Sequence, residues 1–219
     1  MKMLTDYFEY LKFPGINNNN YLNHLVLRHK IYNMKYILIT GFMIASYVSS
    51  FCQVKFPPVD KSPMDMSYYP NGYPVLKIQD KATEPLVARV IFSRPQKNGR
   101  VIFGDLLEYG KVWRLGANEA TEIEFFQGVK IGATKIKKGR YTLYCIPNID
   151  KWTVIVNKEN DTWGSFKYDE TKDVTRIDVP VQKQAEAQEF FVMAFDKSAT
   201  GANLNISWDA VKVSVPIIF

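Results

Sequence analysis

The chain has 219 residues, of which 47% are hydrophobic and 23% charged, and its net charge at pH 7 is +6. It contains only two histidines, His24 and His29, and two cysteines, Cys52 and Cys145. Three of these four residues lie within the first 52 positions, so the function classes that the composition excludes depend on whether that part is retained.

Residues 34–52 have the layout of a secretory signal peptide. Lys35 supplies a positive flank, residues 36–48 supply an apolar core, and small residues up to Cys52 supply a cleavage site before Gln53. The apolar run is shorter than the about 20 residues that a membrane-spanning helix needs. We therefore expect export to the periplasm or the extracellular space.

Two alternatives to simple cleavage remain open: a retained membrane anchor, and a lipoprotein with Cys52 as the lipidated residue. The second fits less well because the bulky Phe51 precedes the cysteine. Since signal peptides begin shortly before their apolar core, Met34 is the expected initiator. Residues 1–33 are then either an over-extended start or a disordered N-terminus, as the polar run 17–20 also indicates.

Removal of residues 1–52 would take away five basic and two acidic residues, so the net charge would fall from +6 to +3. That balance gives no reason to expect nucleic-acid binding, which needs clustered basic residues with stacking aromatics. The remaining 167 residues suffice for one domain. They contain no histidine and one cysteine, which excludes a Ser-His-Asp or Cys-His mechanism, a His/Cys zinc site and an internal disulfide.

Residues 53–74 are rich in proline and lack a repeating apolar period, so we expect an extended lead-in, either docked or mobile. From residue 75 on, short runs of alternating polarity predominate. In residues 122–126, Ile123 and Phe125 alternate with glutamates, which indicates a strand with one buried face. Further strands are expected at 86–92, 129–131, 134–136, 140–146, 152–157, 189–195, 203–208 and 211–215.

Two hairpins are indicated between these strands. The pair Gly132-Ala133 suits a tight turn whose first residue has a positive φ, and residues 147–151 suit a longer one. Helical pattern is scarce, with one or two turns at most at 104–110. The sequence therefore predicts an all-β fold, an antiparallel β-sandwich of jelly-roll or immunoglobulin-like type over residues 75–219, with at most one or two short helices.

The segment 109–121 is too irregular for a strand and too rich in glycine for a helix, and loops on a rigid scaffold often carry binding residues. It contains a flat aromatic ring, a planar cation, an amide, a carboxylate and a hydroxyl, which together suit a sugar or a carboxylate-bearing ligand. A structural role is equally open, with Trp113 closing one end of the sandwich and Arg114 paired with Glu119. The candidate binding residues here are Trp113, Arg114, Asn118, Glu119 and Thr121.

Two other loops supply candidates. Residues 93–100 carry three cations, among them Arg94, and are either an anion-binding loop or a solvated turn. Residues 157–164 place oxygen ligands at alternate positions but do not fit a calcium loop, since Thr162 stands where glycine is needed. Trp163 in this loop is expected to line a pocket beside Trp113 or to belong to the core.

Catalysis by carboxylates remains possible in principle, with Glu119, Asp161 and Asp169 as loop candidates. Sequence alone does not place two of them at a productive separation. Cys145 lies in an expected strand, where a buried and inert thiol is the better interpretation.

Taken together, the motifs of this chain resemble those of the domain-of-unknown-function 2911 family. The resemblance runs from about Phe56 to the C-terminus, and its most specific part is residues 113–121. It implies an exported, mostly β domain of the kind found in Bacteroidota, and it supplies no activity. The motifs are Phe56-Pro-Pro58, Asp65, Ser93-Arg-Pro95, Gly99-Arg100, Ile102-Phe-Gly104, Tyr109-Gly-Lys-Val-Trp-Arg114, Gly116-Ala-Asn-Glu-Ala-Thr121, Gly139-Arg-Tyr-Thr-Leu143, Trp152-Thr-Val-Ile155 and Trp208-Asp209.

The sequence thus favours an exported, non-enzymatic binding module for a glycan, an acidic small molecule or a protein partner. The alternatives are a carboxylate-dependent glycan hydrolase with Glu119 as acid or base, and a structural component of the envelope. No cofactor, metal or nucleic acid is expected, and contact with a membrane is expected only through an uncleaved signal segment.

Overall fold

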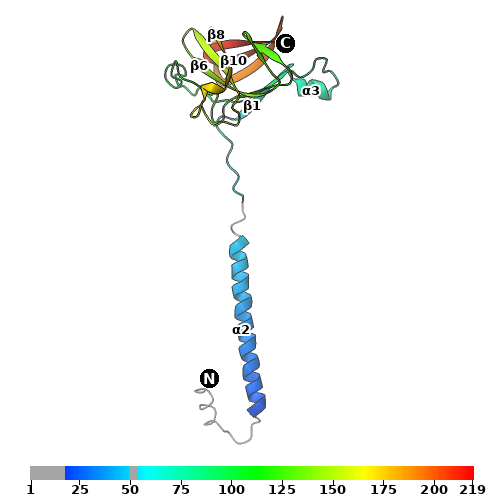
Figure 1. The fold of residues 1–219 in the computed structure, drawn as a ribbon. Helices are drawn as coiled ribbons and strands as arrows, with labels where there is room; N and C mark the ends of the chain where they lie inside the picture. The colour runs from blue at the N-terminus through cyan, green and yellow to red at the C-terminus, as the bar shows by residue number, and fades with distance from the viewer. Residues whose placement is uncertain (1–17, 50–53) are drawn as a thin grey trace. The chain divides into compact units, whose positions relative to one another are not determined.

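The computed structural model describes residues 18–49 and 54–219, so the expected cleavage site before Gln53 and the first 17 residues lie outside the described part (Figure 1). The chain divides into two units, residues 1–58 and 59–219.

The described part of the first unit is dominated by one helix, α2 (Asn18–Ser49). This helix runs through Met34 without interruption, and its described side chains, from residue 23 to residue 42, are exposed. Within the described residues, no helix is both long and apolar enough to cross a membrane. Nothing in the described residues tests export by residues 34–52, which stays a prediction.

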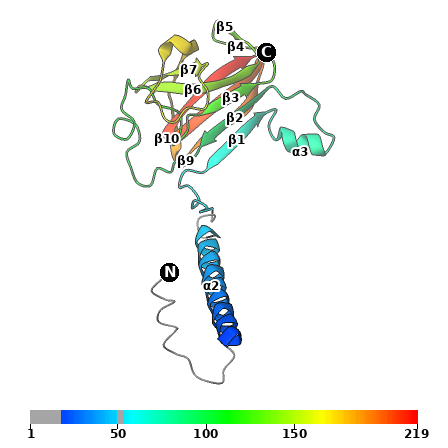
Figure 2. The same cartoon turned by 60° about the horizontal axis from the view of Figure 1, so that its bottom comes forward.

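The second unit contains two antiparallel sheets (Figure 2). The first sheet has the strand order β1-β2-β3-β6-β7-β8, and the second has the order β5-β4-β10-β9. The strands of the first are β1 (Met64–Tyr69), β2 (Ala88–Ser93), β3 (Glu122–Phe125), β6 (Gly139–Pro147), β7 (Lys151–Asn157) and β8 (Asp173–Pro180); those of the second are β4 (Val129–Ile131), β5 (Thr134–Ile136), β9 (Gln182–Ser198) and β10 (Gly201–Ile218).

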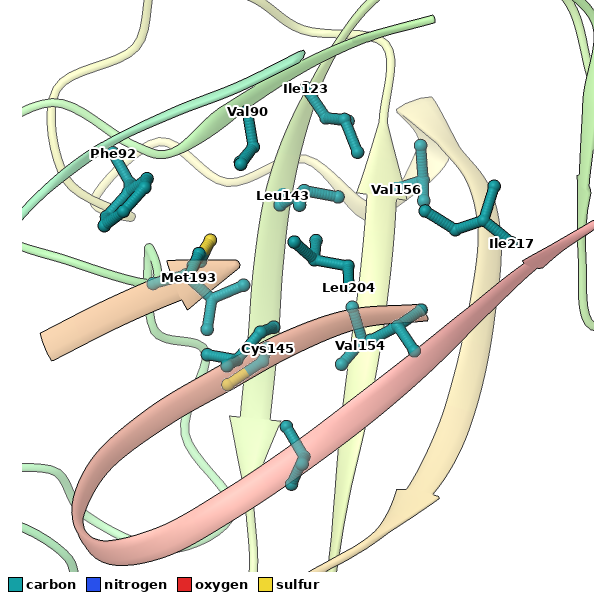
Figure 3. Close-up of a cluster of buried hydrophobic side chains, with 14 of the residues drawn as sticks. Val90, Phe92, Ile123, Leu143, Cys145, Val154, Val156, Met193, Leu204 and Ile217 are labelled. Carbon is teal, nitrogen blue, oxygen red and sulfur yellow. The ribbon is translucent and has the colours of Figure 1, made fainter. Parts of the chain in front are cut away.

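The core lies between the two sheets and forms one large cluster (Figure 3). Alternate residues of several strands enter it, as the pairs Ile123/Phe125 of β3 and Val154/Val156 of β7 show. Cys145 is a fully buried part of this cluster, and burial raises the pKa of its thiol, as expected for an inert cysteine.

The all-β sandwich predicted from the sequence is confirmed. Both hairpins are present, and Gly132 has the expected positive φ of 58°. The sheet nevertheless begins earlier than residue 75, since β1 lies within the proline-rich lead-in and pairs along its whole length with β2. Residues 104–110 form turns and not a helix, and the short helices are α3 (Tyr73–Ile78) and the 3-10 turn η2 (Glu170–Lys172).

One open side of the sandwich is closed by contacts from the first sheet to the edge strand β9. Ser67 Oγ donates to the Met193 carbonyl at 2.8 Å, and Asn71 Nδ2 donates to the Phe195 carbonyl at 2.8 Å. The segment after β2 continues the row, because Phe191 N–H donates to the Pro95 carbonyl at 3.0 Å. These bonds give hydrogen-bond partners to backbone N–H and C=O groups of β9 that would otherwise be unpaired at the edge of the sheet.

Candidate functional site

The outer face of the first sheet is covered, over β6 and β7, by two loops. A small apolar cluster of Ala120, Tyr144 and Ile155 lies there, separate from the main core. Ala120 comes from the connection between β2 and β3, and the partly buried Tyr168 comes from the loop between β7 and β8. We call residues 159–168 the aromatic loop.

The aromatic loop is fastened to residues 112–120 mainly by backbone bonds. Ala120 N–H donates to the Thr162 carbonyl, and Gly164 N–H donates to the Asn118 carbonyl, both at 2.9 Å. These bonds form a β-bridge between Glu119 and Trp163. Ser165 Oγ adds a bond to the Val112 carbonyl at 3.0 Å. The loop is therefore held in place before any ligand arrives.

This loop borders a hollow of about 620 Å³, which is within the usual range for ligand sites. Trp163 and Phe166 line it with exposed side chains, at 62% and 85% of their full accessible area. Neither ring belongs to the buried hydrophobic clusters of the described residues. The other lining residues are Tyr144, Glu159, Asn160, Asp161, Thr162, Gly164, Lys167, Asp169 and Lys172.

Gly164 sets the position of the Phe166 ring. Its φ is +67°, in the region that favours glycine, and a Cβ at this position would lie 2.6 Å from Phe166 Cε2. The ring therefore lies directly against the glycine backbone, where a larger residue would displace it.

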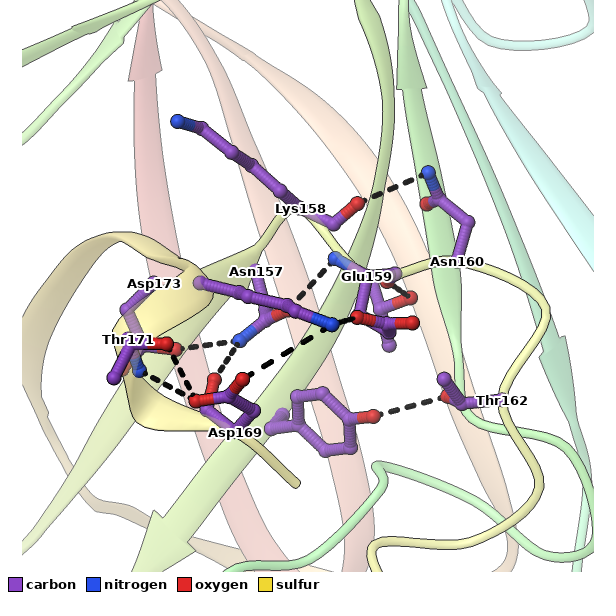
Figure 4. Close-up of polar contacts among 11 residues, drawn as sticks. Asn157, Lys158, Glu159, Asn160, Thr162, Asp169, Thr171 and Asp173 are labelled. Carbon is purple, nitrogen blue, oxygen red and sulfur yellow. Dashed lines mark hydrogen bonds and ion pairs between the residues drawn. The ribbon is translucent and has the colours of Figure 1, made fainter. Parts of the chain in front are cut away.

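Most other residues that line the hollow are polar, and some of them belong to the aromatic loop itself; we call their side chains the polar wall (Figure 4). Lys172 forms an ion pair with Glu159, and its Nζ lies 4.0 Å from Asp169 Oδ2. Asp169 Oδ1 accepts bonds from the hydroxyl and the N–H of Thr171, and these bonds hold the pKa of the Asp169 carboxyl below its ordinary value. Arg140 pairs with Asp161 at 2.6 Å. Most charged groups of the wall thus already have partners.

A further set of hydrogen bonds joins the end of the aromatic loop to Asp173, the first residue of β8. Tyr168 donates to Asp173 Oδ2 at 2.7 Å, and Asn157 Nδ2 donates to Asp173 Oδ1 at 2.8 Å. Burial, and next the bond to Asp173, raise the pKa of the Tyr168 phenol. These residues are ordered by one another and support the wall.

Two of the residues predicted from the sequence as binding residues lie inside the protein. Trp113 is only 5% exposed, stacks on Trp208 with ring centroids 6.0 Å apart, and donates its Nε1–H to the Gly116 carbonyl at 3.0 Å. Thr121 is 1% exposed and donates its hydroxyl to the Leu115 carbonyl. Both side chains shape the loop from within.

Arg94 lies away from the hollow, on the closed side of the sandwich. Its guanidinium pairs with Asp65 at 3.0 Å, donates to the Phe191 carbonyl at 3.3 Å and lies over the Phe190 ring. It therefore ties β1 to β9.

Arg114 forms no ion pair with Glu119 or with any other residue of the described part. Its Nε is buried and has no hydrogen-bond partner there, and burial lowers the pKa of the guanidinium. Asn118 and Glu119 reach the hollow only indirectly, since their backbones hold the aromatic loop. The structure thus brings Asn118 and Glu119 together with Trp163, and places Trp113 in the core.

Sequence reasoning missed Phe166 and the partners Glu159 and Lys172. The signal that points to Phe166 is the short run from Trp163 to Phe166, in which a glycine and a serine separate two aromatic residues within an otherwise polar loop. Within the described residues, no group of three or more His, Cys, Asp or Glu side chains is placed to hold a metal ion.

A family model for proteins of unknown function, DUF2911, matches residues 76–217. The chain belongs to this family. No curated protein and no solved structure matches it. The matched range contains the whole hollow and starts after β1. The segment 113–121, which carries the resemblance most strongly, contributes two buried side chains and the backbone bonds that fasten the aromatic loop.

Proposed function

We propose that this protein is an exported binding module that takes a glycan in the hollow beside the aromatic loop. The observation that carries the proposal is the pair of exposed rings, Trp163 and Phe166, on a loop that is already fastened, in a hollow that is also lined by polar side chains. A sugar ring has an apolar face of C–H groups and a rim of hydroxyls, so it suits an aromatic surface next to hydrogen-bonding groups. A preorganised loop also reduces the ordering cost of binding.

Binding without hydrolysis fits the carboxylates of the hollow. Glycoside hydrolysis requires one carboxyl group that keeps its proton and acts as an acid. Asp169 has a lowered pKa, and Asp161 and Glu159 each form an ion pair with a basic side chain. Glu119 is exposed and joins the aromatic loop through its backbone.

Export rests on the pattern of residues 34–52, and it would place the module in the periplasm or outside the cell, where glycans are available. N-terminal sequencing of the protein recovered from fractionated cells tests it. A start at Gln53 in an exported fraction is expected, and an intact chain confined to the cytosol would contradict export.

The binding proposal is tested by titrating the protein with a panel of oligosaccharides in a calorimeter. Trp163→Ala and Phe166→Ala should each weaken binding about five- to tenfold, since one aromatic contact contributes about 1 kcal/mol. Phe56→Ala is the matched control, because Phe56 is equally exposed, at 85%, and lies outside the hollow. If a variant with both substitutions, Trp163→Ala and Phe166→Ala, stays folded and binds as the unchanged protein does, the hollow is not the site. If no oligosaccharide binds, the glycan proposal fails.

A further inference from the structure

The charges that line the hollow come in nearly equal numbers of opposite sign. The lining contains three carboxylates, of Glu159, Asp161 and Asp169, and two ammonium groups, of Lys167 and Lys172. Arg140 pairs with Asp161 at 2.6 Å and with Glu122 at 3.6 Å, so counting both of these residues leaves the sum at −1. The wall therefore has no excess of positive charge with which to attract an anion.

The ion pairs nevertheless leave hydrogen-bond acceptors unused. Arg140 occupies Asp161 Oδ2 and Lys172 occupies Glu159 Oε2, whereas Asp161 Oδ1 and Glu159 Oε1 accept no bond from the described residues. The Asp161 side chain is 73% exposed, so its free oxygen is accessible. Ionised carboxylates accept only, and bonds to them are stronger than bonds to neutral acceptors. Hydroxyl groups are the complementary donors.

Two charged classes of ligand fit this wall poorly. An acidic sugar would bring its carboxylate against three carboxylates, with Lys167 as the one lining cation that forms no ion pair within the described part of the chain. A cationic ligand would meet carboxylates whose charge Lys172 and Arg140 already largely neutralise, so it would gain little from the charge of the wall. Like charges brought together at an interface cost several kcal/mol in general, so this arrangement discriminates by charge.

We propose that the hollow selects uncharged glycans, with Glu159 and Asp161 as acceptors for the sugar hydroxyls beside the aromatic loop. This inference rests on the proposed function and adds the substrate class. Sugars whose hydroxyls are mostly equatorial are favoured, because their axial C–H groups leave a flat apolar face for Trp163 or Phe166.

The test compares neutral oligosaccharides of glucose, galactose and xylose with uronate oligosaccharides of equal length, and adds choline as a cationic probe. The neutral set should contain a ligand that binds at least about tenfold more tightly than any uronate or choline. Its affinity should change little between about 50 mM and about 500 mM salt, because no net charge is neutralised on binding.

Asp161→Asn supplies the variant. It keeps one acceptor oxygen and removes the charge, so the neutral ligand should bind severalfold more weakly while the discrimination against uronates decreases. Asp178→Asn is the matched control, because Asp178 is an exposed, ion-paired aspartate on β8 outside the hollow. Tighter binding of a uronate or of choline, or an affinity that falls steeply with salt, would overturn the charge inference while leaving a binding hollow. Loss of neutral-glycan affinity in Asp178→Asn but not in Asp161→Asn would also overturn it. If neither neutral nor acidic glycans bind, the proposed function fails as well.

Discussion

Two tryptophans in two neighbouring loops have opposite environments in this protein. Trp113 lies among Trp152, Phe191 and Trp208 between the sheets, and Trp163 lies on the outer surface with no aromatic partner in the described residues. Their loops are nevertheless bonded to each other by the bridge at Glu119. The loop with Trp113 is thus anchored in the core, and it holds the aromatic loop, which carries Trp163 on the outer surface.

The largest difference between the two tryptophans is expected when the buried ring of Trp113 is removed. Trp113→Ala should lower the free energy of unfolding by about 3–5 kcal/mol, because a large buried ring leaves a cavity that its neighbours cannot fill. The midpoint of thermal unfolding should fall by roughly 10 °C for a chain of this size. Trp163→Ala should change stability by less than about 0.5 kcal/mol, as exposed positions usually do. Equal losses in the two variants would contradict the division into anchor and surface.

The sequence predicted the two sheets better than it predicted these loops, for a physical reason. A strand with one buried face imposes alternation that can be read directly, as Ile123 and Phe125 show, and Gly132 marks its turn through its backbone freedom. β1 was not predicted, because prolines surround it and mask the pattern of a strand. It is an edge strand that pairs only with β2 in its sheet.

The candidate site could be predicted only in part. Loops have no periodicity, so the composition of residues 109–121 fits a ligand site and an internal plug equally well. The bonds that decide between them, such as Gly164 N–H to the Asn118 carbonyl, join segments more than 40 residues apart in sequence. Trp163 could be singled out by its residue type, whereas its exposure follows from those distant bonds.

A smaller effect is expected at the glycine that positions the outer surface. Gly164→Ala places a methyl group where the Phe166 ring lies and strains a backbone with φ of +67°. We expect a loss of about 1–2 kcal/mol in stability and a decrease in glycan affinity, because the ring must move. Gly99→Ala is the control, since its φ is also positive and no atom lies within 4 Å of the added carbon. Unfolding curves and titrations of both variants separate backbone strain from displacement of the ring. An equal loss of affinity in the control would contradict the positioning role.

The smallest effect concerns Asp169, in the polar wall of the hollow. Asp169 has a pKa below its ordinary value of about 3.9, because Thr171 donates to its ionised form. The unfolded chain therefore takes up a proton at this group first as pH falls. The stabilisation is present above the ordinary value and is lost as pH decreases through the folded value. In thermal unfolding between about pH 6 and about pH 3, Asp169→Asn should show a slightly weaker decline than the unchanged protein. Identical profiles would contradict a role for this carboxylate in acid sensitivity.

The closed side of the sandwich bears on where the folding domain begins. The family match starts at residue 76, yet Ser67 and Asn71, which cover the edge of β9, and the whole of β1 precede it. A chain trimmed to the family boundary would leave the edge of β2 unpaired and would uncover the part of β9 around Met193 and Phe195, and such edges recruit strands from other molecules. Family boundary and structural boundary therefore differ here: the sheet begins at Met64, and we expect a chain that lacks β1 to self-associate more readily than one that keeps it.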